Sequence, residues 1–238
     1  MTTNGKPSTA LVLAGGKGER LRPLTNDRPK PMVEVNGKPI LQHHLSWLSQ
    51  QGITRAILCT GYLSEVISTY FDANPIKGMS IEYVKEETPL GRGGALRHAF
   101  ENSFIEQEFV VATNGDILTN QSISEMFEFH AKAKVGITIL LKDLVSPYGI
   151  VDLGEGDLVK GFREKPSLPF SFNAGVYIIS SSLFPRFPSI GDHETTLFPD
   201  LAAESLIGGF KCNSYWQSVE TQKDISEAER HLGLVSET

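Results

Sequence analysis

The sequence predicts an α/β fold: a Rossmann-like, mostly parallel sheet sandwiched by helices, with a small antiparallel addition. Apolar runs rich in β-branched residues, typical of buried strands, recur at 10–14, 55–61, 80–86, 109–116, 135–142 and 173–180. Stretches with helical periodicity separate several of them, at 40–52, 64–71, 93–104 and 122–133. Alternating strands and helices build a parallel sheet covered on both faces. After residue 135 shorter strands prevail, which predicts the antiparallel part at the sheet edge.

Individual elements carry their own signals. The stretch at 40–52 stops at Gly52 and gathers its apolar side chains on one face, namely Ile40, Leu41, His44, Leu45 and Leu48. Ser64 is a good N-cap for the next helix, and Glu65 suits its first turn. The segment at 148–166 holds two short strands around the letters GEGD, which predicts a hairpin.

The composition limits the partners and the compartment. The chain has 238 residues, with 22 basic and 28 acidic groups and a net charge of −6, which argues against broad binding to nucleic acids or membrane surfaces. No apolar run approaches the roughly 18 residues of a membrane-spanning helix, and the polar first nine residues lack a signal-peptide core. Cys59 and Cys212 form no disulfide framework, so we expect a protein of the reducing cytoplasm.

The first predicted strand ends in a glycine-rich, basic turn, in the stretch LVLAGGKGERLRPLT at 11–25. Its spacing fits neither the dinucleotide-binding fingerprint nor the P-loop. Glycines let backbone N–H groups approach a phosphate or a base, and Arg20 and Arg22 add charge suited to phosphate. A glycine-rich turn with exposed arginines is the alternative. Lys30 follows between Pro29 and Pro31, which stiffen the chain and predict a lysine held in place for a purpose.

The letters LAGGKGERLRPLTNDRPKPMVEVNGKPIL, which start at residue 13, resemble the signature of the sugar-1-phosphate nucleotidyltransferases. The resemblance continues in order through TGY at 60–62, EETPLGRGGAL at 86–96, NGD at 114–116, YGIV at 148–151, EKP at 164–166 and NAGVYI at 173–178. The first motif alone leaves open enzymes that act on molybdopterin or methylerythritol phosphate, whereas EKP and NAGVYI favour a sugar phosphate. Members of this family join an NTP to a sugar 1-phosphate and release pyrophosphate, so the resemblance implies these two substrates.

The implied reaction is in-line attack of an anionic sugar phosphate on the α-phosphate, which requires charge stabilisation and no general base. By resemblance, the catalytic residues are Arg20, Lys30 and Asp116. Arg20 lies over the triphosphate, and Lys30 reaches the α-phosphate and the leaving group. Lys165 holds the phosphate of the sugar.

Mg²⁺ is the implied cofactor, because it prefers carboxylates and phosphates as ligands. Asp116, which ends the strand FVVATNGD, is the first implied ligand. Many relatives supply the second from a W-x-D-x-G-T pattern, but here Ser218 occupies that place. Glu220 follows two residues later, on the same face of a strand. We expect Glu220 to be the second ligand; the alternative leaves the metal with one protein carboxylate.

The resemblance implies the remaining site residues in two groups. The nucleotide-binding group is Leu13, Gly15, Gly16, Gly18, Arg20, Lys30, Glu86, Gly91 and Asn114. The sugar-phosphate-binding group is Gly149, Glu164, Lys165 and Asn173. Both lie in one domain, residues 1–238, with a nucleotide-binding half at about 8–134 and a sugar-phosphate-binding half at about 135–238.

Glu86 bears on the choice of base. A carboxylate accepts hydrogen bonds and matches the adjacent N1–H and 2-amino donors of guanine, which favours GTP. The overall pattern most resembles the mannose- and heptose-1-phosphate guanylyltransferases, and so implies a hexose or heptose 1-phosphate. The ending WQSVET is instead similar to that of cytidylyltransferases, and enzymes that use UTP or dTTP also stay open.

A regulatory protein that binds a nucleotide sugar without catalysis is the alternative of another class. Ser218 in place of Asp and Glu19 in place of the usual Thr favour it, whereas the catalytic residues and Lys165 favour an enzyme. Relatives are often dimers or tetramers, so the resemblance implies a homo-oligomer, with a dimer expected.

Overall fold

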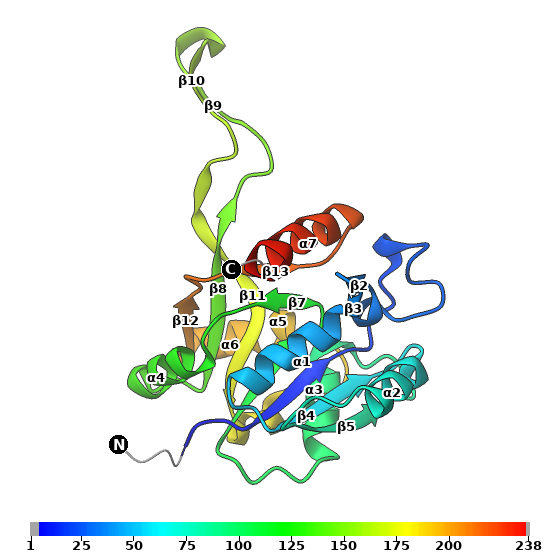
Figure 1. Cartoon of the computed structure of the whole chain (residues 1–238). Helices are drawn as coiled ribbons and strands as arrows, with labels where there is room; N and C mark the ends of the chain where they lie inside the picture. Colours follow the sequence, from blue (N-terminus) through cyan, green and yellow to red (C-terminus); the bar gives the residue numbers. More distant parts are fainter. Residues whose placement is uncertain (1–4, 237–238) are drawn as a thin grey trace.

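Seven strands form the central sheet of the computed structural model, which describes residues 5–236 (Figure 1). Their spatial order is β12-β8-β11-β6-β1-β4-β5. Only β11 runs antiparallel to its neighbours, β6 and β8, so the other six strands of this sheet share one direction. The bounds are β1 (Thr9–Leu13), β4 (Arg55–Thr60), β5 (Ser80–Lys85), β6 (Phe109–Asn114), β8 (Ile137–Val145), β11 (Ser167–Ser180) and β12 (Ile207–Lys211).

The predicted α/β fold is confirmed, but the antiparallel part lies elsewhere than expected. β11 sits inside the sheet, between β6 and β8, and the outer strand on that side is β12. The sequence does not predict β12 because Gly208 and Gly209 interrupt its apolar pattern, and glycine is depleted in strands. The predicted hairpin forms a separate two-stranded sheet of β9 (Ile150–Leu153) and β10 (Val159–Arg163).

Helices cover both faces of the sheet, as expected. Residues 10 and 12 of β1 belong to a core cluster shared with α1, α2 and α4, whereas Leu11 belongs to the cluster on the opposite face, shared with α3 and α6. This alternation follows from the two-residue period of a strand. The helices are α1 (Ile40–Gln50), α2 (Ser64–Ala73), α3 (Gly91–Glu101), α4 (Ile123–Ala133), α5 (His193–Thr196) and α6 (Phe198–Ala203).

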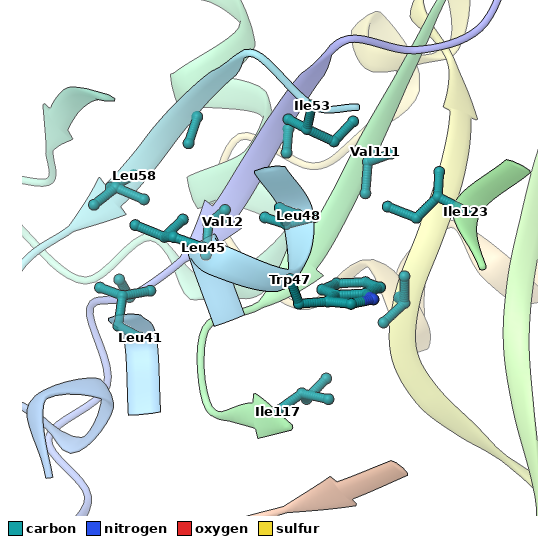
Figure 2. Close-up of a cluster of buried hydrophobic side chains, with 14 of the residues drawn as sticks. Val12, Leu41, Leu45, Trp47, Leu48, Ile53, Leu58, Val111, Ile117 and Ile123 are labelled. Carbon is teal, nitrogen blue, oxygen red and sulfur yellow. The ribbon is translucent and has the colours of Figure 1, made fainter. Parts of the chain in front are cut away.

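The hydrophobic core between α1 and the sheet holds β1 and β6 next to each other. Figure 2 shows Leu45 and Leu48 of α1 among side chains of the strands, including Val12 of β1 and Val111 of β6. All four are fully buried, and burying a side chain of this size stabilises the fold by roughly 1.5–3 kcal/mol. The carboxyl ends of β1 and β6 are therefore held side by side.

The predicted helix boundaries hold to within about three residues. Ser122 caps α4, where its Oγ accepts a hydrogen bond from the Glu125 N–H at 3.2 Å. The cap predicted at Ser64 is wrong: that residue already lies inside α2, and Leu63 precedes it with φ +49° in the left-handed region. The polar first nine residues include 1–4, which lie outside the described residues.

β8 and β11 continue beyond the sheet as a paired ribbon that leads into β9 and β10 (Figure 1). Val145 pairs with Ser167, and the Ser146 N–H donates to the Pro166 carbonyl at 3.0 Å. We call residues 144–170 the arm. It stands away from the body of the molecule in Figure 1, with the short turn η3 (Glu155–Asp157) between its two outer strands.

A third core cluster joins the segment after the glycine-rich turn to the C-terminal helix. Its buried members are Leu21, Val33, Val35, Ile40, Leu118, Val219 and Ala228. The elements that supply or flank them are η1 (Glu19–Leu21), η2 (Lys30–Met32), β2 (Glu34–Val35), β3 (Lys38–Pro39), β7 (Ile117–Thr119), β13 (Trp216–Ser218) and α7 (Gln222–Ser236); η4 (Ser181–Arg186) lies on the other side of the sheet.

Candidate active site

Two adjoining clefts open at the carboxyl ends of β1 and β6, the edge at which open α/β sheets bind ligands. Their volumes are about 380 and 500 Å³. Both are lined by Gly16, Lys30, Asp116 and Glu220. The first is further lined by Leu13, Gly15, Pro31, Glu86, Pro89, Gly91, Arg92, Ala95, Asn114 and Asp192. The second is further lined by Lys17, Gly18, Glu19, Arg20 and Leu21.

The two clefts bring together every residue that the sequence assigns to nucleotide binding, catalysis or metal binding. Proximity alone assigns no role to any of them. The sequence reasoning missed Arg92 and Asp192. Arg92 stands in the glycine-rich stretch PLGRGGAL, a signal that could have found it, whereas Asp192 is 100 residues away and only the fold brings it there.

The glycine-rich turn is shaped around Lys30. Gly18 has φ +64°, and a Cβ there would lie 2.7 Å from Cβ of Lys30. Only glycine meets both conditions, because L-residues rarely adopt positive φ and the neighbouring atom is not at the end of a flexible chain. The turn is further fixed by the Lys30 N–H, which donates to the Gly16 carbonyl at 3.2 Å, and by the Thr25 hydroxyl, which donates to the Gly18 carbonyl at 2.9 Å.

Lys30 is nearly buried, with 8% of its surface exposed. It opens the short helix η2, with Pro29 before it and Pro31 after it, so the backbone on both sides is restricted. Its Nζ donates to Oδ2 of Asp116 and to Oε1 of Glu220, both at 2.6 Å. A buried ammonium held by two carboxylates is fixed in position, which agrees with the prediction of a lysine held in place.

A short strand ladder brings the two carboxylates together. β7 follows Asp116 directly and pairs antiparallel with β13, where Ser218 lies opposite Ile117. The Val219 N–H then donates to the Asp116 carbonyl at 3.2 Å, so Glu220 comes next to the Asp116 side chain. The two carboxylates stand 104 positions apart in the sequence, which explains why no local sequence pattern predicts their contact.

The surroundings of Glu220 favour the ionised form of its carboxyl group. Partial burial pushes the pKa of its carboxyl upward, but the hydrogen bond and charge of Lys30, together with Ser218 and Arg20, outweigh burial and hold the pKa below its usual range. Ser218 Oγ donates to Oε1 of Glu220 at 3.1 Å, and Arg20 lies 3.4 Å from Oε2. The hydroxyl that replaces the usual Asp therefore supports Glu220 as a hydrogen-bond donor.

The donor set fits a hard divalent cation. Each carboxylate places an oxygen 2.6 Å from the same ammonium, so the pair already surrounds a positive charge. Mg²⁺ typically takes one or two protein carboxylates and completes its shell with phosphate oxygens and water. Asp116 and Glu220 supply two such carboxylates at the junction of the clefts. Within residues 5–236 no group of three or more His, Cys, Asp or Glu side chains is arranged to hold a metal ion.

Glu86 lines the first cleft near Gly15, which belongs to the turn after β1. Its Oε2 accepts a hydrogen bond from the Leu90 N–H at 2.8 Å, and its Oε1 would lie 3.5 Å from a Cβ at Gly15. Burial raises the pKa of this carboxyl, and the Leu90 N–H opposes that shift. One oxygen thus holds the side chain to the backbone, while the other lies beside Gly15, which lines the first cleft together with Glu86.

Arg92 crosses the rim of the first cleft and ties two chain segments together. Its guanidinium bonds Asp192 at 3.1 Å and Glu194 at 2.9 Å. Burial raises the pKa of Glu194 and lowers that of the neighbouring His193 to about 4. His193 Nδ1 lies 3.5 Å from Glu194 Oε2, without hydrogen-bond geometry, so the imidazole is a neutral, packed side chain.

The predicted sugar-phosphate residues line neither cleft. Gly149, Glu164 and Lys165 belong to the arm, where a Cβ at Gly149 would collide with the Phe162 ring and lie 3.0 Å from Glu164 Oε2. Asn173 sits on β11 near the root of the arm, and its amide donates to the Tyr177 hydroxyl at 2.7 Å. None of these four residues is therefore part of the lining of either cleft, but Asn173 lies close to it: its Oδ1 accepts from the Gly175 N–H at 2.9 Å, and a Cβ at Gly175 would lie 2.5 Å from Nδ2 of Asn114 in the first cleft.

A family model described as nucleotidyl transferase matches residues 9–232, a range that contains both clefts and the arm. The chain belongs to the nucleotidyl transferase family. The family predicted from the ordered motifs is thereby confirmed, and the sheet and clefts described above are those of a family member.

Several curated relatives match over most of the chain. It is 38% identical to the D-glycero-α-D-manno-heptose 1-phosphate guanylyltransferase of Aneurinibacillus thermoaerophilus, covering 94% of this chain and 97% of the relative. It is 35% identical to the mannose-1-phosphate guanylyltransferase of Mycobacterium tuberculosis, covering 91% of this chain and 62% of the relative. It is 32% identical to the bifunctional protein GlmU of Methanococcus maripaludis, of which it spans 54%.

Solved structures agree with the fold. The crystal structure of HddC from Yersinia pseudotuberculosis superposes with a TM-score of 0.77 at 25% identity, covering 94% of this chain and 99% of that protein. A structure of the same protein complexed with GMP-PN gives a TM-score of 0.76 at 24% identity. Within residues 5–236, no helix has the length and apolar character needed to cross a lipid bilayer.

Proposed function

We propose that this protein transfers a guanylyl group from GTP to a hexose or heptose 1-phosphate, giving a GDP-sugar and pyrophosphate. The observation that carries the proposal is the Lys30–Asp116–Glu220 cluster at the junction of the two clefts. The relative from Aneurinibacillus, which the chain matches over nearly its whole length, supports the sugar-1-phosphate class and the guanylyl group.

The cluster suits nucleotidyl transfer because the main obstacle to this reaction is the repulsion between two negatively charged substrates. A sugar phosphate is anionic near neutral pH and needs no base, but it must approach the α-phosphate of a second polyanion. Lys30 would contact the α-phosphate and the leaving pyrophosphate, and Arg20, exposed in the second cleft, would cover the triphosphate. Lys30 is held in place by its two carboxylates, and both cations would stabilise the negative charge that develops on the phosphates during transfer.

Asp116 and Glu220 would hold Mg²⁺, as their two hard oxygen donors permit. The bound ion supplies positive charge to the phosphate oxygens. Lys30, and to a smaller extent Ser218 and Arg20, hold the pKa of Glu220 below its usual range and so favour its ionised form.

The guanine preference is proposed from Glu86. The Glu86 carboxylate in the lining of the first cleft would accept from N1–H or the 2-amino group of guanine, whereas uracil and thymine offer a single donor flanked by carbonyls. Gly15 and Gly16 would contact base and ribose through the backbone, since a Cβ at Gly15 would lie only 3.3 Å from the Gly61 nitrogen. Leu13, Gly91 and Asn114 complete the proposed nucleotide wall.

The sugar phosphate is proposed to bind to the second half of the chain, from about residue 135. Lys165 would contact the phosphate, Glu164 and Asn173 would read hydroxyls, and Gly149 would allow close approach. The nucleotide is proposed to bind to the first half, at about 8–134, which supplies most of the lining of both clefts.

The test is a pyrophosphate-release assay with Mg²⁺, using GTP, CTP, UTP and dTTP against mannose, heptose and glucose 1-phosphates. We expect release only when both substrates are present, fastest with GTP and with a mannose or manno-heptose acceptor. Release with CTP as the best donor would replace the guanylyl assignment by the cytidylyl one. Binding of a GDP-sugar without any turnover would instead identify a regulatory protein.

A further inference from the structure

The first turn of α3 is covered by a segment from the second half of the chain, residues 188–192, which we call the strap. A Cβ at Gly91 would lie 2.8 Å from the carbonyl carbon of Gly191, and a Cβ at Gly93 or Gly94 would lie 2.7 or 2.6 Å from atoms of the strap. Carbon atoms in favourable contact are about 3.5–4.0 Å apart. The glycines of the stretch PLGRGGAL are therefore needed for the close packing of the strap on this helix.

The strap also supplies hydrogen-bond acceptors to the start of α3. The N–H groups of Gly93 and Gly94 donate to the Gly191 carbonyl at 2.9 and 3.2 Å. The Arg92 N–H donates to Oδ1 of Asp192 at 2.9 Å. Because the first N–H groups of a helix have no partner within the helix, the strap serves as a cap that a distant segment contributes.

Asp192 holds Arg92 by its side chain as well as by its backbone. Nε and Nη2 of the guanidinium donate to Oδ1 and Oδ2 of Asp192 at 3.3 and 3.1 Å, and Nη1 lies 2.9 Å from Oε1 of Glu194. Two carboxylates of the protein thus already match the charge of Arg92, although Arg92 and Asp192 both line the first cleft. This arrangement is suited to holding the wall of the cleft in position.

Buried rings anchor the strap at both of its ends. Phe187 directly before it and His193 directly after it are each 1% exposed, and their ring centroids lie 5.6 Å apart. The Asp192 carbonyl also accepts from the Thr196 hydroxyl at 2.9 Å. The backbone of Asp192 is therefore held to the core, so this residue can fix the position of a neighbouring segment.

Leu90 connects the strap to Glu86. The Leu90 carbonyl accepts from the Gly191 N–H at 2.7 Å, and the Leu90 N–H donates to Oε2 of Glu86 at 2.8 Å. Leu90 directly precedes Gly91, whose φ of +74° belongs to the turn into α3. The position of the Glu86 carboxylate in the first cleft thus depends on where the strap holds Leu90 and the start of the helix.

We propose that Asp192 is a positioning residue for the base of the nucleotide. By holding Arg92 and the start of α3, it keeps the Leu90 N–H on Glu86, so that the Glu86 carboxylate stays in place to accept hydrogen bonds from guanine. This role rests on the proposed function, which assigns the base to Glu86. Asp192 acts on base selection through Glu86 and has no part in the charge stabilisation of the transferred phosphate.

The first measurement is the affinity for GTP and for UTP, by calorimetric titration with Mg²⁺ and without sugar 1-phosphate. Asp192→Ala should weaken GTP binding about tenfold, the lower end of the effect of losing one hydrogen bond to a charged group, and should reduce the preference over UTP by a similar factor. Asp192→Asn keeps an oxygen for the Arg92 N–H and should lose less. Glu101→Ala removes the 2.7 Å ion pair with Arg97 at the other end of α3 and, as the matched control, should leave both affinities unchanged.

A double-mutant cycle with Glu86→Gln shows whether Asp192 acts through Glu86. If it does, Asp192→Ala should weaken GTP binding by less than about twofold further in the Glu86→Gln background. Effects that multiply independently, unchanged GTP affinity in Asp192→Ala, or an equal loss in Glu101→Ala would overturn the positioning role. If Asp192→Ala does not fold, Asp192→Asn gives the same cycle. Unchanged GTP affinity in Glu86→Gln alone would instead overturn the guanine assignment of the proposed function.

Discussion

Glu220 gives the sharpest test of the proposed cation site, because a neutral neighbour serves as its control. Glu220→Gln keeps the size of the side chain but removes its charge. The wild-type carboxylate accepts from Lys30 at 2.6 Å and from Ser218 at 3.1 Å, and pairs with Arg20 at 3.4 Å. A hydrogen bond to a charged group contributes about 1.5–3 kcal/mol. Since the Glu220 side chain is 38% exposed, solvent screening favours the lower end.

A loss of about 1.4 kcal/mol corresponds to a factor of ten. The Mg²⁺ concentration for half-maximal rate should therefore rise about tenfold in Glu220→Gln, with partial recovery at high Mg²⁺ because Asp116 remains. Ser218→Ala removes only a donor to Glu220 and should shift that concentration by less than about threefold. The assay is the initial rate of pyrophosphate release during a Mg²⁺ titration. A damaging Ser218→Ala beside a silent Glu220→Gln would refute the proposed ligand.

Three further predictions concern the sugar phosphate, the glycine-rich turn and acid stability. Lys165→Ala should raise the KM for the sugar phosphate far more than that for the nucleotide, with Lys160→Ala on the same arm as control; an effect confined to the nucleotide would mean that Lys165 serves the other substrate. Gly18→Ala should cost about 1–3 kcal/mol in backbone strain and reduce turnover by displacing Lys30, whose Cβ lies 2.7 Å from the new methyl group; unchanged kcat and melting temperature would contradict this. Burial lowers the pKa of His44 to about 4, so its neutral form stabilises the fold above pH of about 6.5, and this contribution should be lost as the pH falls toward 4. Denaturant unfolding of His44→Gln should then show a pH slope smaller by up to about 1.4 kcal/mol per pH unit in that window, and an identical slope would show that the imidazole does not titrate there.

Local patterns predicted the part of the sheet formed by β6, β1, β4 and β5 well, because each signal there extends over only a few residues. The strands that follow the glycine-rich turn and the helices between them have strong periodicity, and α1 and α4 formed close to their expected bounds. The sequence does not predict β12 because two of its five residues are glycine. The position of this strand in the sheet is set by its pairing with β8. The position of β11 inside the sheet likewise depends on long-range pairing, which no local pattern encodes.

The same distinction holds for the candidate site. The glycine-rich turn and Lys30 stand close in sequence, so their motif predicts their contact. Glu220 could be named only from a resemblance, because its contact with Asp116 arises from the β7–β13 ladder. The sequence could not predict where the arm places Gly149 and Lys165. A hairpin signal predicts the strand pairing and the turn, but not the direction in which the hairpin leaves the body of the molecule.

The proposed role of the Lys30–Asp116–Glu220 cluster in nucleotidyl transfer can be measured at Asp116. Its carboxylate bonds Lys30 and is the proposed first ligand of Mg²⁺. The measurement is the pyrophosphate-release rate of Asp116→Asn at saturating Mg²⁺, GTP and sugar 1-phosphate, beside Asp72→Asn, an exposed acid of α2, as the matched control. We expect Asp116→Asn to lose turnover while keeping the circular dichroism and melting behaviour of a folded protein, and Asp72→Asn to keep wild-type turnover. Near-normal turnover in Asp116→Asn would show that the cluster does not carry the reaction.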